Sequence, residues 1–377
     1  MKQIKENKKR ILILNYEFPP IGGGAATATF NMLSVLSGKK DIEIDLVTSS
    51  ANKFHVEKFA KNIKIHYLDI GKNDQVHLQS NKDLLTYSWK TFWYCRKLKR
   101  ENTFDLAHAF FGIPSGFIAM FLGLPYIVSL RGSDVPFYSE KYRMLDILFF
   151  SWLSKIVWGR AKKVVTNSEG LKELALRTKK NQEIEVIYNG VDTELFFPNS
   201  EQNDEFIVIS TSRLIERKGV DLLVKAFLAF AKDKDDAKLI LAGDGNLKNS
   251  LEEVVLESNI KNKIIFLGAL SRREMPDLYR KGNVFVLPSL NEGMSNSLLE
   301  AMASGLAVIA TDTGGTKELV DSWNGIVIKK GNQKAIFGAF ERLYADRNSL
   351  LEKQRSSRSK AMKMNWEDMA DKYLEIY

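Results

Sequence analysis

Two glutamates, Glu292 and Glu300, flank the expected start of a helix in the stretch PSLNEGMSNSLLEAMAS, residues 288–304. An apolar run directly before it predicts a buried strand, and Ser295 and Asn296 favour the N-cap of a helix. In open α/β sheets, ligands bind where a strand passes through a loop into a helix. Free amides at a helix N-terminus attract anions, whereas ionised carboxylates accept hydrogen bonds, for instance from sugar hydroxyls. The stretch therefore predicts a site for a phosphate flanked by sugars, as in a nucleotide sugar.

A cluster of basic residues forms a second candidate site, directly after the apolar run Phe206–Thr211. Arg213 can bind a phosphate through two parallel N–H donors, and Lys218 adds a compact positive charge. Gly219 would open the following helix, so the segment suits a diphosphate. Because charge runs are usually solvated, a basic surface turn is the alternative.

The first half of the chain contains three further candidates. The run Gly22–Gly24 would let a phosphate or sugar approach the backbone, or it is a plain strand-to-helix turn. His108 lies in an apolar run and is either a site residue or a satisfied core histidine. Arg131 stays protonated, so it cannot act as a base, but it could bind an anionic acceptor or the phosphate of a donor.

Together these residues resemble a known family, the retaining glycosyltransferases of family 4, which have the GT-B fold. Glu292 and Glu300 match its E-x7-E motif, and Arg213 and Lys218 match its R-x4-K pair. The resemblance covers essentially the whole chain and is strongest from Arg213 to Glu318. Short motifs have many false matches, so the two motifs support each other more than either stands alone.

The resemblance implies transfer of a sugar from a nucleoside diphosphate sugar to a hydroxyl, with retention of the anomeric configuration. Arg213 and Lys218 would hold the donor diphosphate, Glu292 the hydroxyls of the donor sugar, and Glu300 those of the ribose. The catalytic candidates are Arg213, Lys218, Glu292 and His108. The donor-binding candidates are Gly23, Gly24, Met294, Ser295, Asn296 and Glu300, and the acceptor-binding candidate is Arg131.

The sequence departs from the family at two of these places. In the family, the strand that contains His108 ends in one or two histidines. Phe110 stands at the position of the second histidine, which puts any catalytic role of that position in doubt. Arg131 stands where many relatives have histidine. The family commonly works without an essential metal, so neither a metal nor a cofactor is expected, and Asp233–Asp235 predicts a solvated turn.

Apolar runs separated by helical patterns predict two parallel sheets with helices on both faces. The first set of expected strands is Ile11–Leu14, Ile44–Thr48, Ile63–Leu68, Leu106–Ala109, Tyr126–Leu130 and Val164–Asn167. The second set is Phe206–Thr211, Leu239–Ala242, Ile264–Leu267, Val284–Leu287 and Ala307–Thr311. Helices are expected over Ala25–Leu36, Val220–Ala231 and Asn365–Tyr377.

The expected architecture is α/β, with two doubly wound, Rossmann-like domains facing across a ligand cleft, the GT-B arrangement. We expect an acceptor-binding domain over residues 1–197 and a nucleotide-sugar-binding domain over 198–360. The resemblance implies that a last helix, 361–377, crosses back to the first domain. At 377 residues the chain has room for two or three domains.

Charge is unevenly distributed along the chain. Residues 1–190 contain 29 Lys and Arg against 18 Asp and Glu, whereas the whole chain has a net charge of +9. The first half therefore predicts an anionic partner, such as a membrane surface or a phosphorylated acceptor. A single cysteine, Cys95, excludes a disulfide framework and suits a reducing cytosol.

Two segments mix basic and aromatic residues on helical patterns, Lys82–Arg100 and Lys141–Lys163. Such helices can lie on an anionic bilayer, or they are ordinary helices that pack on a sheet. The uncharged stretch Leu106–Leu130 is broken by glycines and prolines and predicts strands and a short helix rather than a membrane span. We expect a cytoplasmic protein, peripheral on the inner face of a membrane, with a glycan or lipid-linked acceptor.

Two other classes of function remain open at this stage. A protein of this fold could bind a nucleotide sugar or glycan without catalysis, and Phe110 leaves that alternative open. A nucleic-acid binder would use the basic first half, but the sequence has no recognisable nucleic-acid-binding motif. No nucleic-acid partner is therefore expected.

Overall fold

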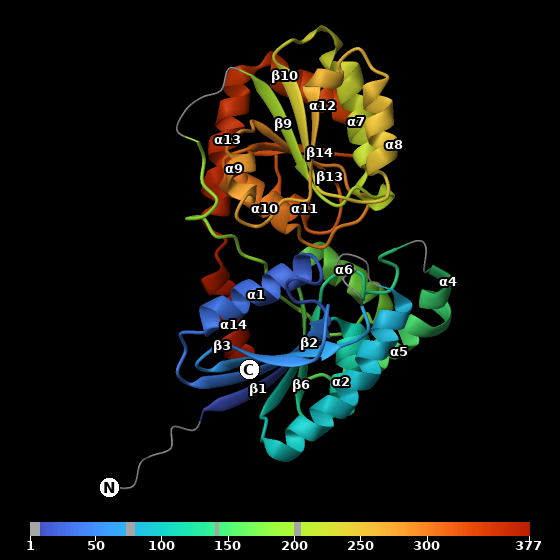
Figure 1. Cartoon of the computed structure of the whole chain (residues 1–377), viewed down its shortest axis with the longest axis vertical. Helices are drawn as coiled ribbons and strands as arrows, with labels where there is room; N and C mark the ends of the chain where they lie inside the picture. Colours follow the sequence, from blue (N-terminus) through green and yellow to red (C-terminus); the bar gives the residue numbers. More distant parts are fainter. Residues whose placement is uncertain (1–7, 73–79, 140–142, 200–204) are drawn as a thin grey trace. The chain divides into compact units, whose positions relative to one another are not determined.

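The computed structural model describes residues 8–72, 80–139, 143–199 and 205–377, and it divides the chain into two compact units (Figure 1). Unit 1 comprises Met1–Asn189 together with Trp366–Tyr377, and unit 2 comprises Gly190–Asn365. The first division thus falls at the Asn189–Gly190 turn rather than at residue 197. The second falls at Trp366 rather than at residue 361, so the last helix belongs to unit 1.

Unit 1 is built on an eight-stranded sheet with the order β3-β4-β2-β1-β5-β6-β7-β8, in which only β3 runs antiparallel to its neighbour. Its strands are β1 (Lys9–Leu14), β2 (Ile42–Ser50), β3 (His55–Ala60), β4 (Ile63–Asp69), β5 (Leu106–Phe110), β6 (Tyr126–Leu130), β7 (Lys163–Thr166) and β8 (Glu185–Val186). The order reverses between β1 and β5, which makes this edge the topological switch point.

Helices cover both faces of the unit 1 sheet. They are α1 (Gly24–Leu36), α2 (Asn81–Glu101), α3 (Phe117–Met120), α4 (Arg143–Leu145), α5 (Ser151–Arg160), α6 (Glu169–Thr178) and α14 (Trp366–Ile376). Helical turns η1 (Gly112–Gly116) and η3 (Asp146–Phe150) precede α3 and α5. Helices α1 and α14 pack together on one face, whereas α3 contacts both α2 and α5 on the other (Figure 1).

Unit 2 has a six-stranded, all-parallel sheet with the order β11-β10-β9-β12-β13-β14. Its strands are β9 (Phe206–Thr211), β10 (Ala237–Ala242), β11 (Ile264–Gly268), β12 (Val284–Leu287), β13 (Ala307–Thr311) and β14 (Gly325–Ile328). Its α-helices are α7 (Val220–Phe230), α8 (Lys248–Leu256), α9 (Met275–Tyr279), α10 (Asn296–Ala303), α11 (Thr316–Leu319), α12 (Gln333–Ala345) and α13 (Arg347–Ala361). The switch point of this sheet lies between β9 and β12.

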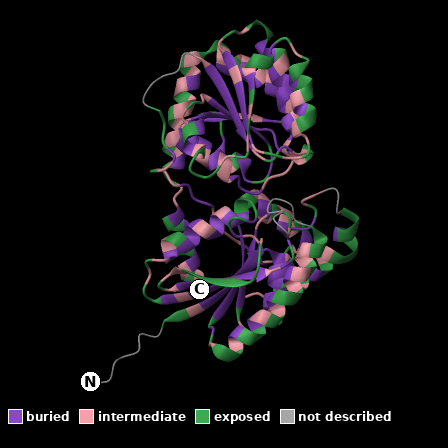
Figure 2. Cartoon of the chain, in the orientation of Figure 1, coloured by how far each residue is buried: buried purple, intermediate pink, exposed green. Residues whose placement is uncertain are grey.

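The strands form the core of each unit, while the helices are buried on one side only (Figure 2). Strands β5, β6, β9, β12 and β13 are buried at every position, as expected for parallel strands that are covered on both faces. This explains why continuous apolar runs, rather than alternating ones, mark them in the sequence.

All eleven expected strands are present, and four of them have the expected bounds. The short or edge strands β3, β8 and β14 were not predicted, because β3 is largely exposed and β8 is only two residues long. The stretch Leu106–Leu130 forms β5, η1, α3 and β6. None of the described helices is both long enough and apolar enough to cross a membrane.

Candidate functional site

The loops that follow β9 and β12 meet at the switch point of unit 2. The backbone N–H of Leu290 donates to the carbonyl oxygen of Arg217 at 2.9 Å. The Arg217 guanidinium in turn donates to the carbonyl oxygen of Asn291 at 3.1 Å. The two segments predicted to bind diphosphate and sugar are therefore joined by backbone and side-chain hydrogen bonds.

A glycine is required where these loops cross. Gly219 has a φ of +64°, in the left-handed region, and a Cβ at this position would overlap the carbonyl oxygen of Pro288. The glycine opens α7, as the sequence predicted. Its role in the free protein is to let the two loops approach each other.

Lys218 and Glu292 form an ion pair across the two loops. The Lys218 Nζ donates to Glu292 Oε1, and their side chains keep only 14% and 11% of their accessible surface. The pair is nearly enclosed, so screening by water and salt is weak. The structure thus places the cation expected to bind phosphate beside the carboxylate expected to bind a sugar.

The loop after β13 supports Glu292 from the other side. Gly314 has a φ of +44°, and a Cβ there would overlap the carbonyl oxygen of Glu292. The backbone N–H of Gly315 donates to the carbonyl oxygen of Gly293 at 2.7 Å. Loops from three neighbouring strands therefore converge on the backbone around Glu292.

Helix α10 begins directly beside this cluster. Ser295 is its N-cap, and its hydroxyl accepts a hydrogen bond from the backbone N–H of Leu298 at 3.3 Å. Met294 is buried, and Asn296 is partly exposed at the first helical position. The helix start therefore lies next to Glu292, where its amides favour an anion.

Glu300 lies one turn into α10 and has a hydrogen-bond partner that the sequence analysis missed. The buried hydroxyl of Tyr279 donates to Glu300 Oε2 at 3.1 Å and also hydrogen bonds Thr211 Oγ1 at 2.8 Å. Burial raises the pKa of the Glu300 carboxyl to about 7, although the Tyr279 hydrogen bond and the charge of Arg272 act to lower it. No spacing in the sequence marks Tyr279, because its contact with Glu300 exists only once α9 packs beside α10.

Arg213 belongs to the same loop as Lys218 and has an exposed side chain. The backbone of this loop is fixed by the next strand, since the N–H of Ser212 donates to the carbonyl oxygen of Ala242 at 3.1 Å. Unit 2 thus groups four of the predicted residues, Lys218, Glu292, Ser295 and Asn296, and keeps Arg213 exposed on the loop after β9.

In unit 1 the glycine run lies at the switch-point edge, directly after β1. The backbone N–H of Gly23, the residue before α1, donates to Glu17 Oε2 at 3.1 Å. Gly22 has a φ of +108° and would clash with the Glu17 side chain if it had a Cβ. Both Gly23 and Gly24 are exposed, and the N–H of Gly23 is already hydrogen bonded to Glu17.

His108 is fully buried in the middle of unit 1, with both ring nitrogens occupied. Its Nδ1 lies 2.7 Å from the hydroxyl of Tyr377, and its Nε2 lies 2.7 Å from Ser129 Oγ. Burial lowers the pKa of the imidazole to about 3, helped by the charge of Arg131. This geometry favours the alternative that His108 is a satisfied core histidine that ties the C-terminal residues to the sheet.

Arg131 follows β6 and lies near His108. Its guanidinium donates to Asn189 Oδ1 at 2.8 Å and lies 5.6 Å from the ring centre of Phe110. Burial lowers the pKa of this guanidinium. Its Nε is buried and has no hydrogen-bond partner among the residues that the structure describes.

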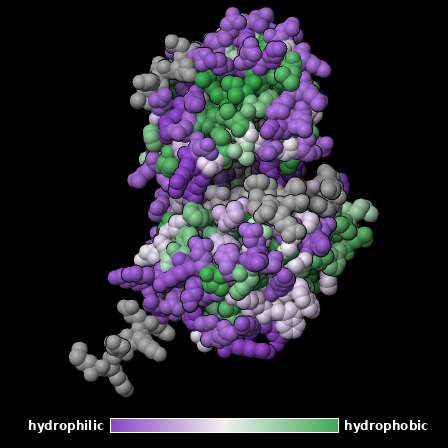
Figure 3. Space-filling model, in the orientation of Figure 1, coloured by the Kyte–Doolittle hydropathy of each residue, from purple (hydrophilic) through white to green (hydrophobic). Residues whose placement is uncertain are grey.

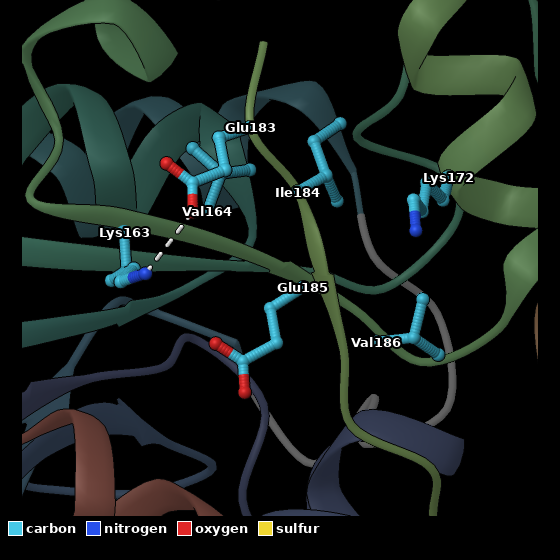
Figure 4. A pocket seen from close by; sticks show the side chains of 7 residues that line it. All are labelled: Lys163, Val164, Lys172, Glu183, Ile184, Glu185 and Val186. Carbon is cyan, nitrogen blue, oxygen red and sulfur yellow. Dashed lines mark hydrogen bonds and ion pairs between the residues drawn. The ribbon is translucent and has the colours of Figure 1, made fainter.

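A cavity of about 320 Å³ lies at the far edge of the unit 1 sheet, beside β7 and β8 (Figure 4). Lys163 and Glu183 form an ion pair of 3.4 Å at its rim. The edge strand β8 is separated from the switch point by three strands, and none of the predicted site residues lines the cavity. Across the described ranges, no cluster of three or more His, Cys, Asp or Glu side chains has the geometry to hold a metal ion.

Comparison with known families and proteins extends these observations. Residues 22–195 match the family described as Glycosyltransferase Family 4, and residues 191–364 match Glycosyl transferases group 1. An uncharacterized glycosyltransferase of Methanocaldococcus jannaschii is 29% identical over 329 residues, which cover 86% of this chain and 85% of that one.

A second relative comes from Campylobacter jejuni. It is named N-acetylgalactosamine-N,N'-diacetylbacillosaminyl-diphospho-undecaprenol 4-alpha-N-acetylgalactosaminyltransferase, and it is 26% identical over 86% of this chain and 87% of its own length.

Solved structures share the fold over nearly the whole chain. A sucrose-phosphate synthase from Thermosynechococcus elongatus superposes with a TM-score of 0.86 at 21% identity, covering 98% of both chains. HepE of Anabaena, solved in complex with UDP-glucose, gives a TM-score of 0.73 at 18% identity, covering 97% of this chain and 98% of that one.

Proposed function

Because the chain belongs to the family 4 and group 1 glycosyltransferases and has their GT-B fold, we propose that it is a retaining enzyme that uses a nucleoside diphosphate sugar. It would transfer the sugar to a hydroxyl of a lipid-linked or cell-envelope glycan. The observation that carries this proposal is the enclosed Lys218–Glu292 pair at the start of α10.

The donor would bind along the switch-point edge of unit 2. Lys218, Arg213 and the amides at the start of α10 supply positive charge and N–H donors for the diphosphate. Glu292 would accept hydrogen bonds from hydroxyls of the donor sugar, and Glu300 from those of the ribose. Since Lys218 and Glu292 already touch, a donor that engages both must lie directly at their junction.

The reaction breaks the bond between the anomeric carbon and the diphosphate oxygen and forms a bond from that carbon to the acceptor oxygen. The products are the glycosylated acceptor, the nucleoside diphosphate and the proton released by the acceptor hydroxyl. Negative charge grows on the diphosphate as it leaves, so groups that are already aimed at it lower the barrier. Removing one such stabilising group from the protein costs about 3 kcal/mol, or roughly a hundredfold in rate.

The acceptor class is supported by a relative rather than by a residue. The Campylobacter jejuni relative is named for a diphospho-undecaprenol acceptor, which is a lipid-linked glycan. HepE was solved with UDP-glucose, which supports a uridine nucleotide among the donors to be tried. A lipid-linked acceptor lies at a membrane, so we propose that the enzyme works at the cytoplasmic surface of one.

The test is a panel of nucleotide sugars with the purified protein, with and without membrane extract, in which release of free nucleoside diphosphate is measured. We expect one donor to be used, with a dependence on the extract. Glu292→Ala and Lys218→Ala should reduce release by about a hundredfold or more. Lys225→Ala, which removes an exposed lysine on α7 of the same unit, serves as the matched control and should keep full activity.

Binding of a nucleotide sugar without release of its nucleoside diphosphate would support the other candidate, a protein that recognises nucleotide sugars or glycans without transferring them. Calorimetry with the same panel separates the two. If no donor is bound or turned over, the assignment of Lys218 and Glu292 to a donor site is refuted.

A further inference from the structure

The segment from α4 through η3 to α5 exposes a series of large apolar side chains. Leu148 is 73% exposed, Trp152 61% and Phe149 50%. Met144, Leu145 and Ile147 are also more than half exposed. Hydrophobic residues gather at this edge of unit 1 in the space-filling view, over α4 (Figure 3). Scattered apolar residues are normal on a surface, but a cluster of this size indicates a binding surface.

This segment is not loosely attached. Its inner face packs into the core through Leu153, Val157 and Trp158. The carboxylate of Asp146 accepts a hydrogen bond from the backbone N–H of Phe137 at 2.8 Å, which ties η3 to the loop after β6. The apolar side chains on the outer face are therefore presented by a fixed helix rather than by a segment that could fold inward.

Helix α2 presents a second stripe of the same kind. Leu85, Trp89 and Trp93 recur every four residues on its outer face, and Trp89 is 68% exposed. The opposite face, with Tyr87 and Cys95 among its residues, is buried in the core. A helix that only covered the sheet would need one apolar stripe, whereas α2 has two.

Helix α3 links the two stripes, because it contacts both α2 and α5 on the same face of the sheet. Phe117, the first residue of α3, and Phe121, directly after its last, add two exposed rings that pack against each other with their centroids 5.1 Å apart. The Arg160 guanidinium of α5 reaches Met120 of α3 at 3.8 Å. The exposed apolar residues thus occupy neighbouring helices, and we call them together the three-helix surface.

Positive charge accompanies these apolar residues. Helix α2 contains six Lys and Arg against two Asp and Glu, and Arg96 lies 5.7 Å from the ring centre of Trp93. From Arg143 to Arg160 the only carboxylate is Asp146, which is buried, whereas Lys155 and Arg160 are exposed. Tryptophans beside basic residues are typical of helices that lie at the interface of an anionic bilayer.

We propose that the three-helix surface, formed by α2, α3 and the α4–η3–α5 segment, docks unit 1 on an anionic lipid bilayer with the side chains around Leu148 and Trp152 inserted. The inference deepens the proposed function and rests on it for its purpose, since a lipid-linked acceptor lies in that bilayer. A second copy of the chain is a poorer fit, because a symmetric contact would bring two positively charged surfaces together.

The test measures binding to vesicles of phosphatidylcholine alone and of phosphatidylcholine mixed with phosphatidylglycerol, by co-sedimentation of the full chain. We expect binding to the mixed vesicles, weakened by salt. The double variant Leu148→Ser/Trp152→Ser should bind at least tenfold more weakly. Trp323→Ser, at a 77% exposed tryptophan of unit 2, is the matched control and should bind like the unaltered chain.

A second variant tests the contribution of charge. Arg96→Gln/Lys97→Gln should lose roughly fivefold in affinity per residue for the mixed vesicles and should be less sensitive to salt. Circular dichroism should show that all variants fold, since every altered side chain is exposed. Donor affinity, measured by calorimetry without vesicles, should be unchanged in these variants, which separates docking from the donor site.

Three results would overturn the inference. The first is equal binding to both kinds of vesicle with no effect of salt. The second is a loss in Trp323→Ser as large as that in the Leu148/Trp152 variant. The third is a concentration-dependent dimer, seen by light scattering, that the Leu148/Trp152 variant no longer forms, together with no vesicle binding by the unaltered chain. The surface would then bind a second copy. Failure of donor turnover alone would refute the proposed function and leave the vesicle result to be judged separately.

Discussion

The pKa of Glu300 leads to a quantitative prediction about donor binding. The carboxyl has a pKa of about 7 because burial disfavours its charged form. The proposed ribose contact requires the ionised carboxylate, since the protonated acid has one acceptor fewer. Donor affinity should therefore rise as the pH increases through neutrality.

The size of the effect follows from the fraction of Glu300 that is ionised. With a pKa of about 7, about a tenth of the carboxyl is ionised at pH 6 and about nine-tenths at pH 8. If only the ionised form binds, affinity should rise about tenfold over this range, or about 1.4 kcal/mol. His108 does not contribute, because its pKa of about 3 keeps it neutral throughout.

The assay is calorimetric titration at several pH values with the nucleotide sugar identified in the panel. The intact sugar ester is needed, because a free nucleoside diphosphate titrates its own terminal phosphate near neutrality. Glu300→Gln cannot ionise and should bind more weakly with no dependence on pH. Tyr279→Phe removes a hydrogen bond that lowers the Glu300 pKa, so the midpoint of the dependence should move to higher pH.

An affinity that does not change between pH 6 and pH 8 would refute the proposed role of Glu300. An equal slope in Glu300→Gln would also refute it, since the titrating group would then be another residue. A midpoint that Tyr279→Phe leaves in place would show that the hydrogen bond between the two side chains does not set the pKa.

Three further predictions concern stability and catalysis. The raised pKa of Glu300 adds stability at acidic pH that is lost as the pH rises from about 4.5 to about 7. At pH 8, Glu300→Gln should therefore have a free energy of unfolding about 1–2 kcal/mol higher than that of the unaltered chain, after allowing for partial exposure. Thermal unfolding at pH 8 should show this as a higher Tm. Gly219→Ala places a side chain in the left-handed region against Pro288, so it should destabilise unit 2 by about 2 kcal/mol or more in urea unfolding. It should also abolish release of the nucleoside diphosphate. Full stability would contradict this account of the loop crossing. His108→Phe removes two buried hydrogen bonds and should cost about 2–3 kcal/mol of stability with donor affinity intact, whereas lost turnover in a fully stable variant would restore a catalytic role.

The sequence determined the class of fold and the loops that form the candidate site. Runs such as Val284–Leu287 and Ala307–Thr311 are apolar without interruption, and only strands buried on both faces tolerate that pattern. Gly219 and the N-cap residue Ser295 mark the ends of their elements locally, through backbone freedom and a side-chain hydrogen bond. These features act over a few residues, so they can be inferred from the sequence alone.

The tertiary structure decided which side chains touch. The contact between Lys218 and Glu292 joins residues 74 positions apart, and that between Tyr279 and Glu300 depends on how α9 packs beside α10. The sequence leaves His108 open as a site residue or a core histidine, and only the fold brings Tyr377, 269 residues away, against one of its ring nitrogens. Burial, partners and pKa depend on groups brought together by the whole fold, and the local pattern of the chain contains no record of them.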